Sequence, residues 1–196
     1  MPYRIKFRRR RENKTNYSKR KIFIISGKIR FCVRRSNKYI LVQFIKPAIQ
    51  GDITLLAVNS MKLKKYGWPF SCKNLPAAYL TGYLAGLKAL KHGIKEAVLD
   101  IGLRTPTKGN RIFAVVKGAI DAGLEIPVGE EVLPSEERIK GSHIVEYFKI
   151  LKEKGEHEKR FSAYVKNNLN IEEIQNYFEK VKSEIFEKIG AKNVSS

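Results

Sequence analysis

The stretch from Tyr3 to Lys21 constrains the fold most, because it cannot contribute to a hydrophobic core. It contains ten Lys or Arg and a single acid, Glu12, and four arginines run consecutively from Arg8 to Arg11. Adjacent guanidinium groups repel one another, so we expect this segment to lack a fixed structure until a polyanion neutralises it. The folded domain must therefore be built from the rest of the chain.

Aromatic and hydroxyl side chains lie between the cations of this tail, at Tyr3, Phe7, Thr15, Tyr17 and Ser18. Arginine binds phosphate oxygens in pairs, and an aromatic ring stacks on an unpaired base with roughly 1–3 kcal/mol per base. The combination favours RNA over the alternatives, a solvated basic tail or a nuclear address signal. For Tyr17 two roles stay open: stacking on a base, or packing the end of the tail onto the domain.

Charge is unevenly distributed along the 196 residues. The chain has a net charge of +20 and a pI near 10.0, and residues 1–95 hold 23 of the 39 Lys and Arg but only two of the 19 acids. Such an excess indicates nucleic acid or an anionic membrane as the partner. We therefore expect the first half of the chain to face RNA. A hydrophobic content of 43% predicts a real core, in one domain with an appendage.

The cysteines and the hydropathy of the sequence indicate the cellular compartment and whether a metal site or a membrane span is expected. Cys32 and Cys72 belong to no CxxC pair, and the three histidines are poorly spaced for zinc, so we expect no metal and no other cofactor. Two isolated cysteines suit a reducing cytoplasm, and the charged N-terminus does not resemble a secretory signal. The longest apolar stretch, Leu75 to Leu90, is too short to span a bilayer and contains Lys88, so no membrane is expected.

Alternating apolar and polar residues predict strands. In the first, Ile29, Phe31 and Val33 share one face, while Arg30, Cys32 and Arg34 share the other. The first two strands are expected to form a hairpin, and the last to be a buried parallel strand. The predicted strands are Ile29–Arg35, Lys38–Lys46, Ile53–Val58 and Ala97–Ile101.

Helices are indicated by caps, prolines and apolar spacing. Thr15 or Asn16 would cap a short helix holding Lys19–Lys21, and Asn110 would cap another. Ile126–Gly141 is expected to be a loop and Lys152–Arg160 a charged linker. The longer predicted helices are Asn74–Gly93, Arg111–Ala122, His143–Lys152 and Ile171–Ile189, and Ser60–Lys73 is a loop or short helix. Strands followed by alternating helix, strand and helix predict a mixed sheet covered by helices.

Three features have alternative explanations. Gly82 and Gly86 lie four residues apart, a spacing that we attribute to close approach of the helix to the sheet rather than to membrane dimerisation. Trp68 either fills the edge of the core or contacts RNA or a neighbouring protein. The apolar stripe of Ile171–Ile189 packs on its own domain or on a partner.

Candidate chemical sites are few. The loop Arg104–Asn110 joins a strand to a helix start, where free N–H groups could hold an RNA phosphate; an ordinary connection is the alternative. Asp100, at a strand end, is the one acid that suggests a Mg²⁺-dependent nuclease, because Asp52 lies in a turn and Asp121 lies late in a helix beside its stop signal. We expect His92 and His143 to lie at helix ends with structural roles, and no catalysis.

Six stretches carry a resemblance to a known family, in the family's own order across residues 3–147. The chain resembles the large-subunit ribosomal protein family numbered eighteen, and more narrowly its archaeal and eukaryotic branch, which binds 5S ribosomal RNA. Asn13 and Asn16 stand where many relatives carry Gly and Asp. The stretches are FRRRRENKTNYSKRK, RRSNKYILVQFI, KKYGW, NLPAAYLTGYLAGLKAL, EAVLDIGLRTPTKGNRIFAVVKGAIDAGLEIP and GEEVLPSEERIKGSHIVEY.

The resemblance implies an α/β fold with a mixed sheet, shared in outline with small-subunit protein eleven. It implies a structural, non-catalytic protein of the large subunit of the cytoplasmic ribosome. There it would attach 5S rRNA to the large-subunit rRNA in the central protuberance, beside neighbouring ribosomal proteins. The family's RNA-contacting tail corresponds to Arg8–Arg11, Lys14, Thr15, Tyr17 and Arg20. A non-ribosomal RNA-binding or assembly factor is the alternative, which co-sedimentation with the large subunit in high salt would distinguish.

The resulting domain plan has three parts: residues 1–26 as basic RNA-binding tail and short helix, 27–127 as α/β core, and 128–196 as loop and C-terminal helical extension. The predicted RNA-binding residues are Tyr3, Lys6, Arg8, Arg9, Arg10, Arg11, Lys14, Thr15, Tyr17, Arg20, Lys21, Arg34, Arg35, Asn37, Lys38, Lys108 and Asn110.

Overall fold

The structure, a computed structural model, describes residues 4–190 and has the α/β fold with a mixed sheet that the sequence predicted. Four strands form one sheet in the order β3-β2-β1-β4. The β1–β2 and β2–β3 pairs are antiparallel, and β4 runs parallel to β1. The strands are β1 (Arg30–Arg35), β2 (Ile40–Lys46), β3 (Ile53–Asn59) and β4 (Val98–Asp100).

The predicted hairpin is confirmed by the register of β1 against β2, which pairs Phe31 with Phe44 and Val33 with Val42. These four side chains are buried on one face of the sheet. In the turn, the Ser36 hydroxyl accepts hydrogen bonds from the backbone N–H groups of Lys38 and Tyr39. The strand β4 is parallel, as predicted, but it is only half-buried before Asp100 because it forms the edge of the sheet.

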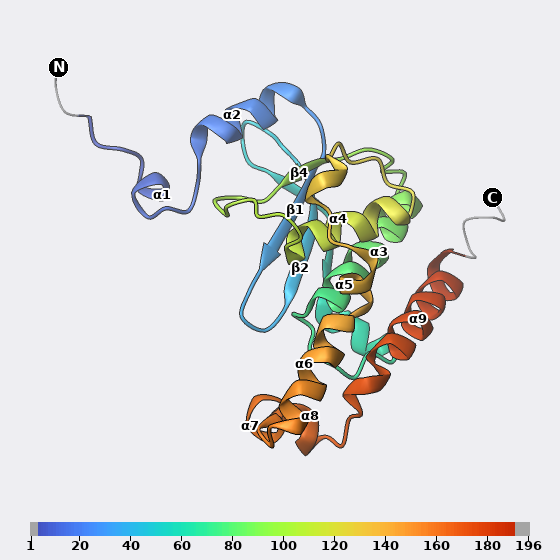
Figure 1. Cartoon of the computed structure of the whole chain (residues 1–196). Helices are drawn as coiled ribbons and strands as arrows, with labels where there is room; N and C mark the ends of the chain where they lie inside the picture. The colour runs from blue at the N-terminus through green and yellow to red at the C-terminus, as the bar shows by residue number, and fades with distance from the viewer. Residues whose placement is uncertain (1–3, 191–196) are drawn as a thin grey trace.

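Helices α3 (Leu75–Lys91) and α4 (Arg111–Asp121) pack side by side against the sheet (Figure 1). Each begins where the sequence predicted, because the side chain of Asn74 or Asn110 accepts hydrogen bonds from the first free N–H groups. Pro76 lies in the first turn of α3, where its missing N–H costs nothing. His92 follows the end of α3, and His143 lies in the first turn of α6 (Ser142–Glu153), both at helix ends as expected.

The glycines of α3 serve a different contact from the one predicted. They approach α4, not the sheet: a Cβ at Gly82 would collide with the backbone of Val115, and one at Gly118 would collide with the backbone of Tyr79. Gly86 faces Ala119 in the same way. The two helices therefore touch backbone to backbone, which leaves their other faces free to cover the sheet and to receive the C-terminal helix.

The C-terminal third is more helical than predicted. The expected loop Ile126–Gly141 contains a 3₁₀ turn and α5, which ends at Gly141 with a φ of 95° and buries Ile139. The expected charged linker contains the whole of α7, and α8 follows it. Aromatic packing stabilises these two short helices, because the ring of Phe161 lies 5.9 Å from that of Tyr164. The elements are η2 (Glu130–Val132), α5 (Glu136–Lys140), α7 (His157–Arg160) and α8 (Ser162–Lys166).

The last helix packs on its own domain, which confirms that interpretation. Its apolar stripe is buried throughout, although the helix is divided into a 3₁₀ turn, a regular α-helix and a final π turn. These are η3 (Ile171–Glu173), α9 (Ile174–Ile185) and η4 (Phe186–Gly190), and the buried stripe is Ile171, Ile174, Phe178, Val181, Ile185 and Ile189.

Trp68 is buried, which confirms the core explanation for it, and it follows the 3₁₀ helix η1 (Ser60–Tyr66). Cys32 and Cys72 are free and buried, as expected for small apolar side chains. Between residues 4 and 190, no helix is both long enough and apolar enough to cross a bilayer.

Candidate nucleic-acid interface

The basic tail extends away from the sheet and ends in a helix docked on it (Figure 1). Arg8–Arg11 form one helical turn, α1, where the sequence predicted no fixed structure, yet none of its residues is buried. The turn continues into Asn13, which has a left-handed φ of 51°. Asn tolerates that conformation better than most side chains.

The tail cations differ in how far they are already paired. The carboxylate of Glu12 lies 2.7 Å from Lys14 Nζ and 3.6 Å from Arg8 Nε. Arg9 Nε donates a hydrogen bond of 2.9 Å to the Thr15 hydroxyl. The exposed cations whose side chains form neither an ion pair nor a hydrogen bond in the described part of the tail are Arg4, Lys6, Arg10, Arg11, Lys19 and Lys21. Tyr3, also predicted to bind RNA, lies outside the described residues.

Helix α2 (Tyr17–Ser26) confirms the predicted short helix and its cap, because Asn16 Oδ1 accepts a hydrogen bond from Lys19 N. Tyr17 is half-buried against Phe7, with ring centroids 5.2 Å apart. The contact lies within the tail, so Tyr17 folds the tail on itself. The two ring planes are tilted by 57° to each other.

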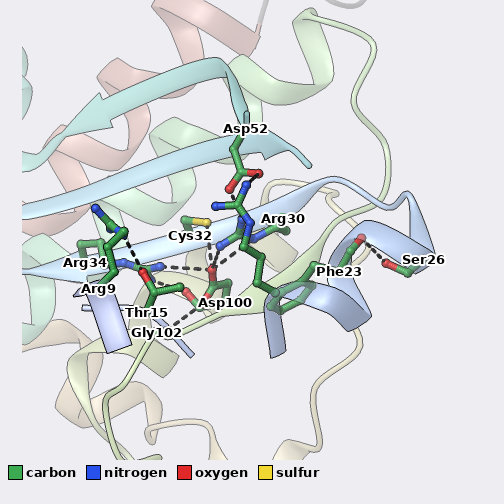
Figure 2. A network of polar contacts seen from close by, with 11 residues as sticks. Arg9, Thr15, Phe23, Ser26, Arg30, Cys32, Arg34, Asp52, Asp100 and Gly102 are labelled. Carbon is green, nitrogen blue, oxygen red and sulfur yellow. Dashed lines mark hydrogen bonds and ion pairs between the residues drawn. The ribbon is translucent and has the colours of Figure 1, made fainter. Parts of the chain in front are cut away.

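A cluster of ion pairs holds α2 on the sheet (Figure 2). Arg20 Nη2 donates to Asp52 Oδ1 over 3.1 Å, and Arg30 Nη1 donates to Asp52 Oδ2 over 2.7 Å. The guanidinium of Arg30 also lies 4.9 Å from the centre of the Phe23 ring, a cation–π contact. Asp52 thus joins a helix residue to a strand residue, and Arg20, predicted to bind RNA, has this structural role as well.

Asp100 is the centre of the same cluster (Figure 2). Its carboxylate accepts hydrogen bonds from both Nε and Nη2 of Arg30, from Arg34 Nη2 and from Gly102 N. Burial alone would raise the pKa of Asp100, but the bonds from Arg30 and Gly102 and the charges of Arg30 and Arg34 outweigh it and lower the pKa to about 2. Asp100 is therefore an ionised structural acid.

Cys32 lies against this carboxylate, with Sγ 3.3 Å from Asp100 Oδ2. Burial and the negative charge of Asp100 together raise the pKa of the thiol to about 12, so it stays protonated and inert. The metal-dependent nuclease finds no support in this geometry. Oδ2 of Asp100 is engaged by Arg30 and Arg34 and Oδ1 by Gly102 N, and residues 4–190 contain no group of three potential metal ligands.

A cavity of about 220 Å³, which we call the tail pocket, opens between the tail, α2 and the Asp100 cluster. Six cations and two carboxylates line it, so an anion inside would meet a net positive field. Its largely cationic lining suits a phosphate group. The cations are Arg9, Lys14, Lys19, Arg20, Arg30 and Arg34, and the acids are Asp52 and Asp100.

The remaining predicted residues lie elsewhere. Arg35, Asn37 and Lys38 are exposed at the hairpin turn, at the other end of β1 from Arg30. A six-residue strand is about 20 Å long, so they belong to a different surface from the tail pocket. Arg34 forms two hydrogen bonds to Asp100. Its Nη2 donates to the carboxylate, and its Nη1 donates to the backbone carbonyl over 2.7 Å.

The loop before α4 offers less to a phosphate than predicted. Asn110 Oδ1 accepts hydrogen bonds from the N–H groups of Ile112 and Phe113, so two of the donors expected to be free are occupied. Asn110 Nδ2 donates to the Thr107 hydroxyl. Lys108 is exposed, 3.5 Å from Glu131. The side chain of Asn110 therefore acts as a helix cap.

Sequence reasoning did not include Lys19, Arg30, Asp52 and Asp100 in the interface. One signal for them was present: alternation places Arg30, Cys32 and Arg34 on one face of β1. Two arginines on a buried strand require a carboxylate opposite, and the parallel pairing of Cys32 with Asp100 supplies it.

Comparison with known proteins agrees with this basic, non-catalytic surface. A family described as "Ribosomal large subunit proteins 60S L5, and 50S L18" matches residues 1–95 and 91–129. Among similar proteins, "Large ribosomal subunit protein uL18" of Caldivirga maquilingensis is 54% identical over 189 residues, covering 95% of this chain and 91% of its own. The proteins of the same name from Aeropyrum pernix and Saccharolobus solfataricus are each 50% identical, covering 94% and 93% of this chain and 88% and 93% of their own. The chain therefore belongs to the family of large-subunit ribosomal proteins described as 60S L5 and 50S L18, and is a structural, non-enzymatic component of the large ribosomal subunit.

Proposed function

We propose that the protein binds 5S rRNA through its N-terminal tail and α2, and that it attaches this RNA to the large-subunit rRNA in the central protuberance, beside neighbouring ribosomal proteins. In this proposal residues 1–26 bind RNA, 27–127 form the supporting core, and 128–196 dock on neighbours. The ribosomal role itself follows from family membership, as does the place on the cytoplasmic ribosome, so the non-ribosomal alternative is not needed.

The observation that carries the proposal is the contrast between the exposed arginine turn α1 and helix α2, which is held firmly on the sheet. No residue of α1 is buried, and Arg10 and Arg11 form no ion pair within the described residues. Directly after the tail, α2 is held by Asp52 and Asp100 through Arg20 and Arg30. The free cations therefore extend from a rigid support, which reduces the entropy lost when they order on RNA.

The tail pocket supports the same proposal. Arg9 uses only Nε internally, and Arg20 only Nη2, so each keeps guanidinium N–H groups for a ligand. Both line the 220 Å³ pocket with Lys19. Forked N–H donors around a space of this size suit the oxygens of one RNA phosphate. The choice of 5S rRNA among RNAs rests on the resemblance of the tail and hairpin sequences to the 5S-binding branch of the family.

A deletion that respects the helix cap tests the proposal. Removing residues 1–15 leaves Asn16 to cap α2 and leaves the Arg20–Asp52 pair intact. We expect the shortened protein to melt within a few degrees of the full chain while its affinity for labelled 5S rRNA falls at least tenfold in 150 mM salt. Equal affinity of the two proteins for 5S rRNA would refute the proposal.

A second variant measures the charge contribution. Arg10→Gln with Arg11→Gln should flatten the slope of log affinity against log salt by about 1.4–1.8, since each single-stranded or duplex phosphate contact contributes about 0.7 or 0.9. The matched control is Lys91→Gln with Lys95→Gln, which removes two exposed cations beyond the tail and should leave the slope unchanged. A slope that responds equally to both pairs would mean that only net charge matters.

A further inference from the structure

A second basic hollow lies at the opposite end of β1 from the tail pocket. It has a volume of about 670 Å³ and lies between the β1–β2 turn, the loop that follows η1 and the α7–α8 segment. Figure 1 shows the turn joining β1 and β2 directed away from α2, at the end of the molecule where α7 and α8 lie. We call this hollow the hairpin groove. It combines two predicted residues, Asn37 and Lys38, with a segment that the sequence indicated only as a linker.

The lining of the hairpin groove is cationic and contains no acid. Lys38, Lys64, Lys73 and Arg160 line it, and all four are exposed. None of them forms an ion pair with any residue between 4 and 190, unlike the cations around Asp52 and Asp100. Four unpaired cations around one concave surface attract a polyanion.

The floor of the hairpin groove is aromatic and fixed. The ring of Tyr164 lies 5.8 Å from that of Phe70 and 5.9 Å from that of Phe161, and its hydroxyl accepts a hydrogen bond of 3.2 Å from Ser71 N. Phe70 in turn packs at 5.4 Å on the buried Trp68. Because this row of rings is anchored in the core, Phe161 presents a rigid, half-exposed surface at the end of it.

The same floor continues into a neighbouring hollow of about 490 Å³, which shares Lys73 and Phe161 and adds Arg111 and Tyr147. Tyr147 is 46% exposed, with its ring 6.1 Å from that of Phe161. Arg111 Nη1 donates 3.0 Å to the carbonyl of Lys73. Burial, together with the charge of Arg35, lowers the pKa of Arg111. The two hollows therefore form one continuous surface, which shares Lys73, Phe161 and Tyr164.

We propose that the hairpin groove is a second RNA-binding site, and that it takes an unpaired RNA segment. The cations contact successive phosphates, and a base stacks on Phe161. An unpaired segment is favoured over a duplex because the aromatic floor lies inside a concavity, where only a base free of its stack can reach it. The inference concerns a surface beyond the tail and does not depend on which RNA the tail binds. A protein carrying both sites can hold two RNA segments at once.

Binding of a fluorescent ten-nucleotide oligouridine to the full chain tests this site, in the background of Arg10→Gln and Arg11→Gln to weaken the tail. Lys64→Gln with Arg160→Gln should flatten the salt slope by about 1.4, and Phe161→Leu should lower affinity roughly 5- to 150-fold without changing the slope. The matched control, Lys91→Gln with Lys95→Gln, lies about 25 Å away at the far end of α3 and should change neither.

Phe161 also packs on Tyr164 and Phe148, so its replacement could loosen α7 and α8. Photo-cross-linking of a 4-thiouridine oligonucleotide to the unaltered protein is therefore the independent measurement. We expect cross-links in residues 157–167 and near Lys38, in addition to the tail. Cross-links confined to the tail, with wild-type binding by the groove variants, would overturn the inference. The inference would also be overturned if the groove variants bound oligouridine like the unaltered protein but failed to be incorporated into the large subunit. That result would mean that the groove contacts a protein.

Discussion

Replacing Asp100 by Asn tests the central claim about the Asp100 cluster, namely that this carboxylate holds the arginines of β1 in place. Asn keeps the size of Asp and can still accept the hydrogen bond from Gly102 N, so the change removes mainly the charge. The Asp100 side chain is 7% exposed, and Arg30 beside it is 12% exposed. Removal of one partner from so buried a pair leaves the other uncompensated.

The magnitude follows from the pKa. The folded protein lowers the pKa of Asp100 from the ordinary 3.8 to about 2. Since one pKa unit corresponds to about 1.4 kcal/mol, the ionised carboxylate contributes about 2–3 kcal/mol to the free energy of unfolding. Because the pKa is lowered on folding, this contribution is complete above about pH 4 and is lost as the pH falls towards 2. The difference between the two proteins should follow the same course.

Urea unfolding is the suitable assay, because urea adds no ions that would screen the cluster. At pH 7 we expect the free energy of unfolding of Asp100→Asn to be about 2–3 kcal/mol lower than that of the unaltered protein, and the two values to converge between pH 4 and pH 2. The matched control is Glu131→Gln, whose side chain is 86% exposed in its pair with Lys108, and which should change stability by less than about 0.5 kcal/mol. A loss below 0.5 kcal/mol for Asp100→Asn, or a loss that persists unchanged at pH 2, would refute the reasoning.

Three further predictions concern α3, α4 and the tail. Gly82→Ala should lower the free energy of unfolding by about 1–3 kcal/mol, because its Cβ meets the Val115 backbone, whereas Gly129→Ala, with open space around it, should be neutral in the same urea titration. Asn110→Ala should cost about 1 kcal/mol of stability through the lost cap of α4 and leave 5S rRNA affinity within twofold; a larger affinity loss would return the loop to the RNA interface. Tyr17→Leu should weaken 5S rRNA binding by roughly 1–3 kcal/mol at every salt concentration if the ring stacks on a base, with no change in slope; unchanged affinity would limit Tyr17 to its contact with Phe7.

The elements that could be predicted from the sequence are those whose causes are local. Asn16, Asn74 and Asn110 each cap the helix that follows, and the alternation in β1 assigns its two faces correctly. Each of these features depends on hydrogen bonds or periodicity within a few residues. The same is true of the apolar stripe from Ile171 to Ile189, whose spacing alone indicates one buried face.

The features that could not be predicted depend on residues far apart in the chain. Helices α7 and α8 lie in a segment rich in Lys and Glu, and their order comes from Phe161 and Tyr164 packing towards Phe70, about ninety residues earlier. Gly82 shows a close approach by its residue type, but the partner is a helix some thirty residues later rather than the sheet. No local pattern carries that information, because both contacts exist only once the layers have packed.

The Asp100 cluster also limits how the net charge of the first half can be read. Arg20, Arg30 and Arg34 appear in the sequence as part of one long cationic excess, yet in the structure each bonds to Asp52 or Asp100. Arg30 is almost completely engaged in this way, so it can support a phosphate only through its field. The pairs around Glu12 are different. They are exposed and weak, and Arg8 and Lys14 can exchange a carboxylate for a phosphate at little cost. The number of phosphates that the tail neutralises should therefore follow its exposed cations rather than the total charge.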